Sequence, residues 1–360
     1  MSFKKLIMYL VLALSLTSCN NNPKDVEKNE VSQASTQDLN KYDTVIYDYF
    51  DTVTTFMAYT KDEEEFKKYE KILEENLEKY HKLFNTYYDF DGVNNVRTIN
   101  HNRGKEPVKV DSELIDMLKY CLAMDKETKG KINIAMGPVL NIWHNYREEA
   151  IANPDAARLP SDEELKEALA HTDINNLIID EEKSTVFLKD PEGLLDVGAI
   201  GKGYAIKIIE SELKKAGLKH GILSVGGDDV IIGENPTKIN GLWKIAIQNP
   251  DLTAQNPYAS IINVVDNSVV TSGDYQRFYK VDGKIYHHII DPDTLYPSEY
   301  FRSVSVVHPD IALADTLSTY LFMVDYETGL AEVKKHGAEA FWIDKSNREY
   351  KTDGWDKMAD

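Results

Sequence analysis

The segment DVGAIGKGYAI, from Asp196 to Ile206, places three glycines, a lysine and an acid within eight residues. It follows an apolar stretch, and the residues beyond it predict a helix that continues through Leu213 and ends at Gly217. Glycines let the backbone approach an anion closely, and the first N–H groups of a helix favour negative charge. The segment therefore predicts a turn into a helix, and it raises the question of whether that turn binds phosphate.

Two common nucleotide loops do not match this segment. A Walker A loop needs a serine or threonine after its Gly-Lys pair, but Gly203 follows Lys202, and Asp196 stands where the first glycine should be. No frame supplies the G-x-G-x-x-G of a Rossmann fingerprint. Lys202 remains at the start of the helix as a point charge for phosphate. On this segment alone, a phosphate site and a tight turn without a ligand stay equally open.

The segments on either side predict an α+β fold. Residues 43–60 are expected to form a first strand, and apolar residues from Phe66 to Phe84, at three- and four-residue steps, predict a long helix after it. Further helices are expected from Ser112 and Ser161, whereas the C-terminal half reads as paired strands before two helices near 310–323 and 326–336. Because helices come first and paired strands later, we expect α+β rather than a wound parallel sheet.

The first 41 residues predict export and a lipid anchor. Residues 1–18 contain two lysines and then an apolar run, which is the layout of a signal peptide. The sequence LTSC, ending at Cys19, resembles a bacterial lipobox, which implies cleavage before Cys19 and lipidation of its sulfur. An ordinary signal peptide that happens to contain a cysteine is the alternative. We expect a bacterial membrane lipoprotein whose domain lies outside the cytoplasm, in the periplasm.

The remaining boundaries follow from composition. Residues 19–41 comprise the lipidated cysteine and a polar, flexible tether, residues 42–350 the globular domain, and residues 351–360 a C-terminal tail. The net charge of −19 argues against a nucleic-acid partner, which needs a basic patch. A phosphate site in so acidic a chain needs help from lysine, backbone N–H groups or a metal cation. With Cys19 lipidated, Cys121 is the one thiol left, so no intramolecular disulfide is expected.

The segment HPDIALADTLSTYLFMV, residues 308–324, carries the sharpest local signal. It predicts a helix that is apolar almost throughout and therefore buried, with Asp315 and Thr319 on one face because they lie four residues apart. A buried carboxylate is costly unless it is paired or bound to a metal. Carboxylate, hydroxyl and carbonyl oxygens together suit Mg²⁺. An aspartate that is hydrogen-bonded within the core is the alternative, and we favour the metal site.

The segment KIYHHIIDPDTLYP, residues 284–297, contains adjacent histidines. In a strand His287 and His288 point to opposite faces, and Asp291 follows three residues after His288. A histidine and an aspartate near a strand end suit a base and the residue that orients it. A capped Asp-Pro-Asp-Thr turn with one satisfied histidine is the alternative. Two other turns, in LSVGGDDVIIG (223–233) and VVTSGDYQRFY (269–279), are weak signals by themselves.

Taken together, seven segments resemble the ApbE family of FAD:protein FMN transferases, in family order and over about residues 45–345. They are FDTVTTFMAY, INIAMGPVLNIW, DVGAIGKGYA, LSVGGDDV, VVTSGDYQRF, YHHIIDPDTLYP, and SVSVV followed by ADTLSTYLF. The resemblance implies an α+β fold, a single catalytic domain of two interleaved lobes with FAD in the cleft between them. It also implies transfer of FMN from FAD to a threonine or serine hydroxyl of an exported acceptor flavoprotein, through a phosphodiester bond, with Mg²⁺ as cofactor and AMP released.

The resemblance also assigns roles to residues. It implies Mg²⁺ ligands at Asp315, Thr319 and the Ala199 carbonyl, and catalytic roles for His288, Asp291 and Lys202. The positions expected to line the FAD cleft are Asp196, Lys202, Gly203, Gly226, Gly227, Asp228, Thr271, Ser272, Gly273, Tyr275 and His288. The family usually has glycine where this chain has Leu295. Because a glycine there often adopts a positive φ, leucine is expected to strain the turn by roughly 1–2 kcal/mol.

Two other functions stay open at this point. An FAD pyrophosphatase would use water in place of the protein hydroxyl and release FMN and AMP. A non-catalytic flavin-binding lipoprotein would bind FAD in the cleft but catalyse no reaction. The sequence does not distinguish these alternatives from the transferase, although the predicted base, lysine and metal ligands favour catalysis.

Overall fold

The computed structural model describes residues 39–359, so the predicted signal peptide and Cys19 lie outside the described residues. The domain is built around an eight-stranded sheet in which every neighbouring pair is antiparallel. In spatial order its strands are β1 (Asn40–Ile46), β2 (Thr54–Thr60), β6 (Gly221–Val225), β7 (Asp228–Ile232), β10 (Asn267–Gly273), β13 (Phe301–His308), β14 (Glu339–Asp344) and β15 (Glu349–Lys351). Strands from both ends of the sequence thus share one sheet.

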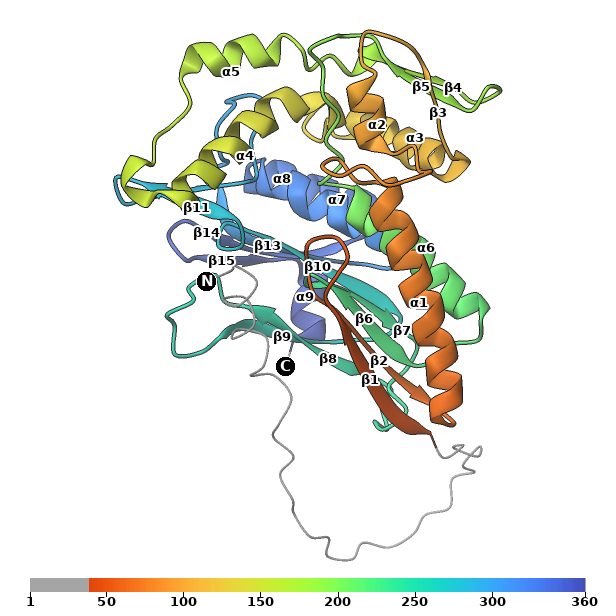
Figure 1. Ribbon diagram of the computed structural model, residues 1–360. Helices are drawn as coiled ribbons and strands as arrows, with labels where there is room; N and C mark the ends of the chain where they lie inside the picture. Colours follow the sequence, from red (N-terminus) through yellow and green to blue (C-terminus); the bar gives the residue numbers. More distant parts are fainter. Residues whose placement is uncertain (1–38, 360) are drawn as a thin grey trace, which may run out of the picture. The chain divides into compact units, whose positions relative to one another are not determined.

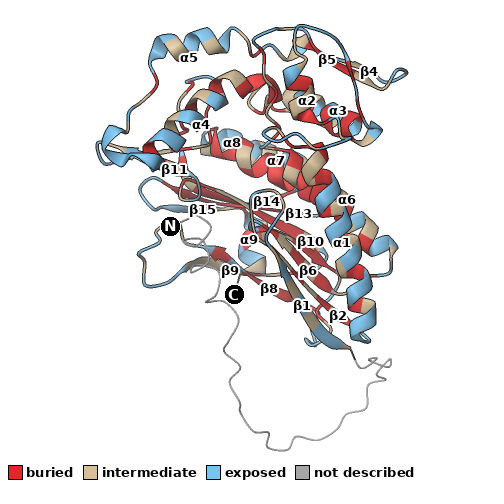
Figure 2. Cartoon of the chain, viewed as in Figure 1, coloured by how far each residue is buried: buried red, intermediate tan, exposed pale blue. Residues whose placement is uncertain are grey.

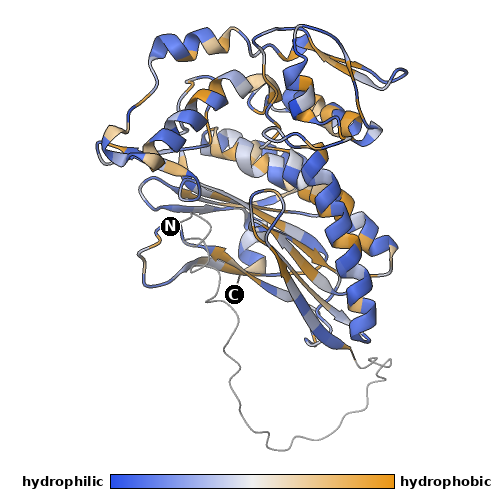
Figure 3. Cartoon of the chain, viewed as in Figure 1, coloured by the Kyte–Doolittle hydropathy of each residue, from blue (hydrophilic) through white to orange (hydrophobic). Residues whose placement is uncertain are grey.

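Four helices cover one face of this sheet (Figure 1). They are α1 (Glu63–Leu83), α6 (Gly201–Lys215), α7 (Ile311–Phe322) and α8 (Tyr326–His336). Alternate strand residues such as Phe56, Leu223 and Val304 are fully buried against the helices, as the period of two in a strand requires. Buried residues are concentrated in the central strands of the sheet (Figure 2), where hydrophobic residues also lie, whereas the outer side of α1 is largely hydrophilic (Figure 3).

A hairpin and a short helix cover the opposite face. The strands β8 (Trp243–Gln248) and β9 (Tyr258–Val264) pair with each other, and α9 (Asp353–Met358) packs with them. Trp355 of α9 is fully buried beside Phe341 of the main sheet, with ring centroids 5.3 Å apart. The tail was expected at residues 351–360, and within it α9 packs into this second core beside the sheet.

A third layer lies over the helices α6 and α7 (Figure 1). Its helices are α2 (Val96–His101), α3 (Ser112–Glu127), α4 (Gly137–Ala152) and α5 (Asp162–Leu169). Its strands are β3 (Val108–Lys109), β4 (Leu177–Asp180) and β5 (Thr185–Leu188), with a separate hairpin of β11 (Phe278–Val281) and β12 (Lys284–His287). A smaller hydrophobic cluster, which includes Trp143 and Leu295, joins α4 to that hairpin.

The α+β prediction is confirmed, and so are most predicted elements, but the first strand is wrong. Residues 43–60 form parts of two antiparallel strands, β1 and β2, because the chain turns between them at Phe50 and Asp51, which have φ of 55° and 51°. Ser161 caps α5 as expected, since its side chain accepts a hydrogen bond from the Glu164 N–H. Within residues 39–359, no helix has the length and apolar character needed to cross a membrane.

Candidate functional site

The start of α6 and the middle of α7 approach each other at Gly203. The Gly203 N–H donates a 2.8 Å hydrogen bond to Oδ2 of Asp315. A Cβ atom on Gly203 would lie 2.5 Å from Cβ of Asp315, closer than real Cβ contacts come. The second glycine of the Gly-Lys-Gly turn is therefore required by helix packing, and it brings the N-terminus of α6 to the metal ligand predicted on α7.

Two oxygen atoms, one before α6 and one on α7, have no hydrogen-bond donor among the described residues. Gly203 is the third residue of α6, so its N–H has no acceptor within the helix, and it donates to Asp315 instead. Among residues 39–359, no hydrogen bond reaches the Ala199 carbonyl or Oδ1 of Asp315. Asp315 is only 7% exposed, and a buried carboxylate with a free oxygen favours a cation. Both oxygens fit the Mg²⁺ ligand set that we expected.

Hydroxyl groups from β10 and α7 gather next to Asp315. Ser272 Oγ lies 2.8 Å from Ser318 Oγ and 3.4 Å from Oγ1 of Thr319. Ser318 Oγ in turn donates to the Asp315 carbonyl at 2.9 Å, whereas Thr319 Oγ1 is at 3.4 Å from the same oxygen. Thr319 is thus only loosely held by its own helix, and its oxygen is available for a cation. Sequence analysis missed Ser318 because an interior serine in an apolar helix gave no signal of its own.

Lys202, one residue before Gly203, is held by an acid of the main sheet. Its Nζ forms an ion pair with Oδ2 of Asp228, which is 4% exposed. The two residues before Asp228, Gly226 and Gly227, turn β6 into β7 with φ of 64° and 91°. Positive φ at both positions is what a two-residue type I′ hairpin turn requires. The glycine pair is thus a hairpin turn, and its predicted contact with FAD stays a prediction.

Burial shifts the pKa values of Asp315 and Lys202 at this junction. It raises the pKa of Asp315, against the opposing effects of the Lys202 charge and the Gly203 hydrogen bond. It lowers the pKa of Lys202, against the opposing charge of Asp315. It also raises the pKa of Asp229 to about 6, although this next residue along β7 points to the opposite face of the sheet from Asp228. Lys202 is thus one cation beside more than one buried carboxylate. A further cation would lower the free-energy cost of burying these ionised carboxylates.

The two adjacent histidines have different environments. His287 Nε2 donates to the Ser298 carbonyl at 2.9 Å, and its Nδ1 accepts from the Ile289 N–H at 3.3 Å. His288 Nδ1 is buried and has no hydrogen-bond partner within residues 39–359. Burial lowers the pKa of His287 to about 4 and that of His288 to about 3. His287 is therefore a satisfied core residue, whereas His288 is neutral at physiological pH and keeps a free ring nitrogen.

The role predicted for Asp291 as the residue that orients His288 is corrected by its contacts. Oδ1 of Asp291 accepts from Lys131 Nζ at 2.6 Å and from the Asp293 N–H at 3.0 Å, and it makes no hydrogen bond to His288 among residues 39–359. Lys131 also pairs with Asp293 at 2.9 Å. The carboxylate points back into its own turn because an Asx turn and a buried lysine satisfy it there. Asp291 is thus a positioning residue of the turn that follows His288.

Leu295 closes this turn in a left-handed conformation. Its φ is 62°, the value that favours glycine, so the expected strain is present. Its N–H donates to the Asp291 carbonyl at 2.8 Å, and its own carbonyl accepts from Trp143 Nε1 at 2.8 Å. The leucine side chain is buried in the cluster around Trp143. The turn therefore keeps the conformation of a glycine turn, and burial of the side chain offsets the strain.

Two arginines that sequence analysis missed lie near His288, and one of them contacts one ring of an aromatic pair. After burial, the charges of Arg277 and Arg147 contribute to its lowered pKa. Arg147 Nη2 lies 2.9 Å from His144 Nδ1, and the His144 ring lies 5.4 Å from the ring of Tyr87. The signal for Arg277 was present in the sequence, since it follows the hydroxyl-rich turn in 269–279. These groups make the His288 side of the site positively charged.

Asp196 connects the two halves of the site. Its Oδ1 accepts from the Gly198 N–H at 2.8 Å, which shapes the turn before α6. Burial raises its pKa, and the charges of His144 and Arg277 oppose that shift. The turn that opens with Asp196 near the His288 group thus ends, six residues later, at Lys202 beside α7. Phosphates lying along this turn would be within reach of cations from both halves.

Three predicted cleft residues lie on the other face of the sheet. Thr271 Oγ1 lies 2.7 Å from Ser305 Oγ, and the Tyr275 ring packs so closely on Gly273 that a Cβ there would lie 2.4 Å from the ring. Successive strand residues alternate in direction, so these residues face away from the one that meets α7, Ser272. The structure does not bring Thr271, Gly273 or Tyr275 to Asp315.

Comparisons with known proteins agree with this arrangement. Residues 50–342 match the family model described as "ApbE family". The chain belongs to the ApbE family. Among curated ApbE relatives, a Klebsiella pneumoniae protein named FAD:protein FMN transferase is 30% identical over 272 residues, which cover 74% of this chain and 81% of the relative. One of the same name from Treponema pallidum is 33% identical over 259 residues, 68% of this chain and 69% of the relative.

Solved ApbE structures have the same fold. The ApbE protein of Thermotoga maritima superposes with a TM-score of 0.77 at 26% identity and covers 89% of this chain and 100% of its own. The structure titled "Flavin Transferase ApbE from Vibrio cholerae" gives a TM-score of 0.72 at 25% identity and covers 89% and 99%. The single α+β domain predicted from the seven ApbE segments is thereby confirmed.

Proposed function

We propose that this chain is an FAD:protein FMN transferase that moves FMN from FAD to a threonine or serine hydroxyl of an acceptor flavoprotein and releases AMP. The names of its ApbE relatives support the transfer. The observation that carries the finer proposal is the hydrogen bond from Gly203 to Asp315, which joins the start of α6 to α7, where the Ala199 carbonyl and one Asp315 oxygen accept no hydrogen bond from residues 39–359. Lys202 lies three residues after Ala199 and directly before Gly203. A proposed cation ligand and a positive charge that can bind phosphate therefore occur in the same turn.

Asp315, Thr319 and the Ala199 carbonyl are the residues that would hold Mg²⁺, since this ion prefers oxygen ligands. When bound, Mg²⁺ would neutralise the pyrophosphate charge and stabilise the departing AMP. Lys202 adds a fixed positive charge, and its ion pair with Asp228 keeps it in position. In a chain with a net charge of −19, such local cations are what allows an anionic substrate to bind.

His288 is the proposed base. Its ring is neutral and its buried Nδ1 has no partner to displace, so that nitrogen is free to accept the proton of the attacking hydroxyl. A pKa of about 3 makes it a weak base in the free chain, and the charge of bound phosphates would raise that pKa toward the working range. Arg277 and Arg147 lie near enough to lower that pKa, and both can bind phosphate oxygens. Asp291 holds the following turn through Lys131, so its contribution to His288 is through the backbone.

We also propose that the enzyme acts outside the cytoplasm. The signal-peptide layout and the sequence LTSC support lipidation at Cys19 and a membrane anchor in the periplasm, with residues 20–41 as tether. The acceptor would then be an exported redox flavoprotein. Labelling of cells with a radioactive fatty acid tests the anchor: the wild-type chain should be labelled and Cys19→Ala should not. Equal labelling of both chains would contradict the anchor at Cys19.

Incubation of the purified chain with FAD and Mg²⁺ tests the activity. With a purified exported flavoprotein domain as acceptor, we expect flavin fluorescence that stays on the acceptor through denaturing electrophoresis. AMP release without any acceptor would favour a pyrophosphatase, and tight FAD binding with neither product would favour a flavin-binding lipoprotein.

Asp315→Ala tests the metal assignment. It should lower Mg²⁺-dependent turnover by about a hundredfold or more, because a bound metal is worth several kcal/mol in such reactions. Asp344→Asn is a matched control, since Asp344 is equally buried, at 7% exposure, but pairs with Arg348 on β15's side of the sheet. That control should change stability and leave the Mg²⁺ dependence intact. Full activity of Asp315→Ala would refute the assignment.

A further inference from the structure

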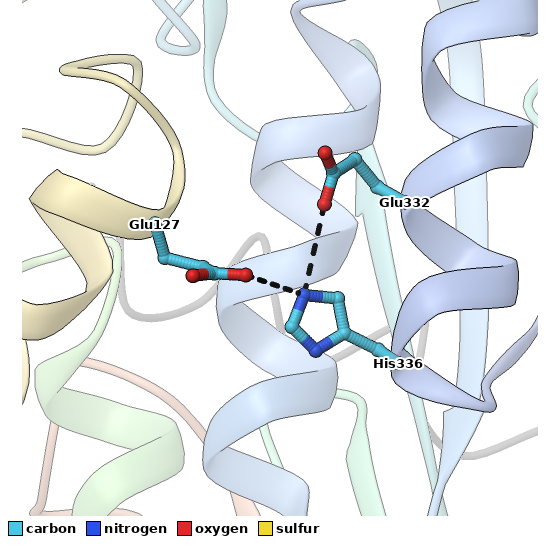
Figure 4. Close-up of side chains that lie close together, drawn as sticks. All are labelled: Glu127, Glu332 and His336. Atoms are coloured by element: carbon cyan, nitrogen blue, oxygen red, sulfur yellow. Dashed lines mark ion pairs between the residues drawn. The ribbon is translucent and has the colours of Figure 1, made fainter.

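Three metal-ligating side chains converge where α3 and α8 end (Figure 4). Glu127 is the last residue of α3, and Glu332 and His336 lie four residues apart on α8. Nε2 of His336 lies 3.2 Å from Oε1 of Glu127 and 3.7 Å from Oε2 of Glu332. One ligand atom from each residue lies within 4.8 Å of the other two. None of the three takes part in the α6–α7 junction or in the group around His288.

We propose that Glu127, Glu332 and His336 form a second cation site, for a divalent transition metal of the zinc class. Zinc binds imidazole nitrogen and carboxylate oxygen at about 2.0–2.1 Å in tetrahedral geometry, which sets neighbouring ligand atoms roughly 3.3 Å apart. The observed separations of 3.2 and 3.7 Å need only small side-chain movements to reach that value. An imidazole ligand selects against Mg²⁺, which prefers oxygen.

The electrostatics of the place also favour a cation. The C-terminus of a helix carries partial negative charge, and here two helices end together, α3 at Glu127 and α8 at His336. The Lys335 ammonium already lies 2.5 Å from Oε1 of Glu127 and 3.0 Å from Oε2 of Glu332, the same two oxygens that His336 faces. Its hydrogen bond lowers the pKa of Glu127, which keeps that ligand ionised. A positive charge is thus bound to these oxygens even without a metal.

Lys335 can give way to a metal, because its side chain is 51% exposed. The three ligands are only partly exposed, at 35% for Glu127, 19% for Glu332 and 17% for His336, so solvent has access to one side. Water would complete four-coordination there, as at other zinc sites with three protein ligands. The metal would cross-link α3 to α8, two helices that lie far apart in the sequence. Because it binds only the folded chain, its binding should raise the free energy of unfolding.

Calorimetric titration of the metal-free full chain with Zn²⁺ tests the proposal, with excess Mg²⁺ present to occupy the Asp315 site. We expect one zinc ion per chain and a rise in the melting temperature. His336→Ala and Glu332→Gln should each weaken zinc binding by about tenfold or more, and the melting temperature of His336→Ala should no longer respond to zinc. FMN transfer in Mg²⁺ should be unchanged in His336→Ala.

Two control variants separate a metal site from a simple ion-pair cluster. Lys335→Met removes the competing ammonium, so a metal site predicts tighter zinc binding, whereas an ion-pair cluster predicts only lower stability. His101→Ala removes a histidine that faces a single carboxylate, Asp89, at 3.9 Å, and should leave zinc binding unchanged. Absence of zinc binding by the wild-type chain, or equal binding by wild type, His336→Ala and Glu332→Gln, would overturn the proposal.

Discussion

The α6–α7 junction requires a glycine, whereas the turn from Asp291 to Tyr296 has a leucine at a position where glycine is usual. At the junction Gly203 has no room for a Cβ atom, because Asp315 lies 2.5 Å from where it would be. In the turn Leu295 occupies the usual glycine position with φ of 62°, and its side chain is buried against Trp143. A glycine required by space is thus irreplaceable, whereas one required only by backbone conformation can be replaced if the new side chain gains burial.

The largest effect is expected at the junction. Gly203→Ala places a methyl group against the backbone-proximal part of Asp315, which cannot rotate away, so α6 and α7 must separate. We expect a loss of about 3 kcal/mol or more in the free energy of unfolding, together with loss of Mg²⁺-dependent turnover. Urea unfolding and the FAD assay measure both. Gly201→Ala provides the comparison, since its nearest contact is a Val197 methyl at 3.3 Å. If Gly203→Ala and Gly201→Ala lower the free energy of unfolding and the turnover equally, close packing against Asp315 does not explain the need for glycine at position 203.

The turn should respond in stability more than in chemistry. Asp291→Ala leaves the largely buried Lys131 with Asp293 alone, and breaking a buried pair costs about 3 kcal/mol. Because Asp291 does not contact His288, turnover measured where the variant is folded should fall by less than about tenfold. Thermal unfolding and kcat at a low temperature separate the two effects. A larger fall in kcat, or a changed pH profile, would restore a direct role in catalysis for Asp291.

His287, the last residue of β12 and four residues before this turn, should make stability depend on pH. Its pKa is about 4 when folded and about 6.5 when unfolded, so below pH 6.5 the unfolded chain binds a proton that the folded chain does not. Stability is therefore full above pH 6.5 and falls as the pH drops through about 4, by about 3 kcal/mol from this residue. Urea unfolding between pH 7 and pH 4 measures the loss. His287→Gln should show a correspondingly shallower decline, and an identical decline would contradict the burial argument.

The smallest effect is expected at Leu295, and its sign sharpens the comparison. Leu295→Gly relieves the strain of a positive φ but loses a buried side chain, so we expect a net loss of about 1 kcal/mol. Leu295→Ala loses the side chain and keeps the strain, so it should be less stable than the glycine variant by about 1 kcal/mol. Thermal unfolding of both variants gives the order. If alanine is the more stable of the two, strain at this position is negligible.

The fold was predictable where one pattern determined one element. The apolar steps from Phe66 to Phe84 gave α1, and the almost wholly apolar helix gave α7 with Asp315 buried on it. The first strand was predicted wrongly because Phe50 and Asp51 turn the chain without a glycine or proline to mark the place. The helix α9 was not predicted because the segment around Trp355 has no regular spacing of apolar residues. Tertiary packing nevertheless buries Trp355 completely.

The candidate site was predictable in its residue types and less so in its partners. The facing of Asp315 and Thr319 follows from helix periodicity, and the split between His287 and His288 follows from strand alternation. The pairing of Lys202 with Asp228, and of Asp291 with Lys131, joins residues far apart in sequence, which no local pattern specifies. Thr271 and Ser272 were assigned together because the turn was considered without the faces of β10.

The Gly203–Asp315 hydrogen bond joins residues 112 positions apart, and α7 follows β13, the strand that pairs with β10. Contacts of such long sequence separation form late, because the chain between them must be ordered first. A partly made chain that stops before α7 would therefore expose the start of α6 without its carboxylate partner. The candidate flavin site can therefore form only in a complete domain, because two of its proposed cation ligands, Asp315 and Thr319, lie in the last third of the sequence.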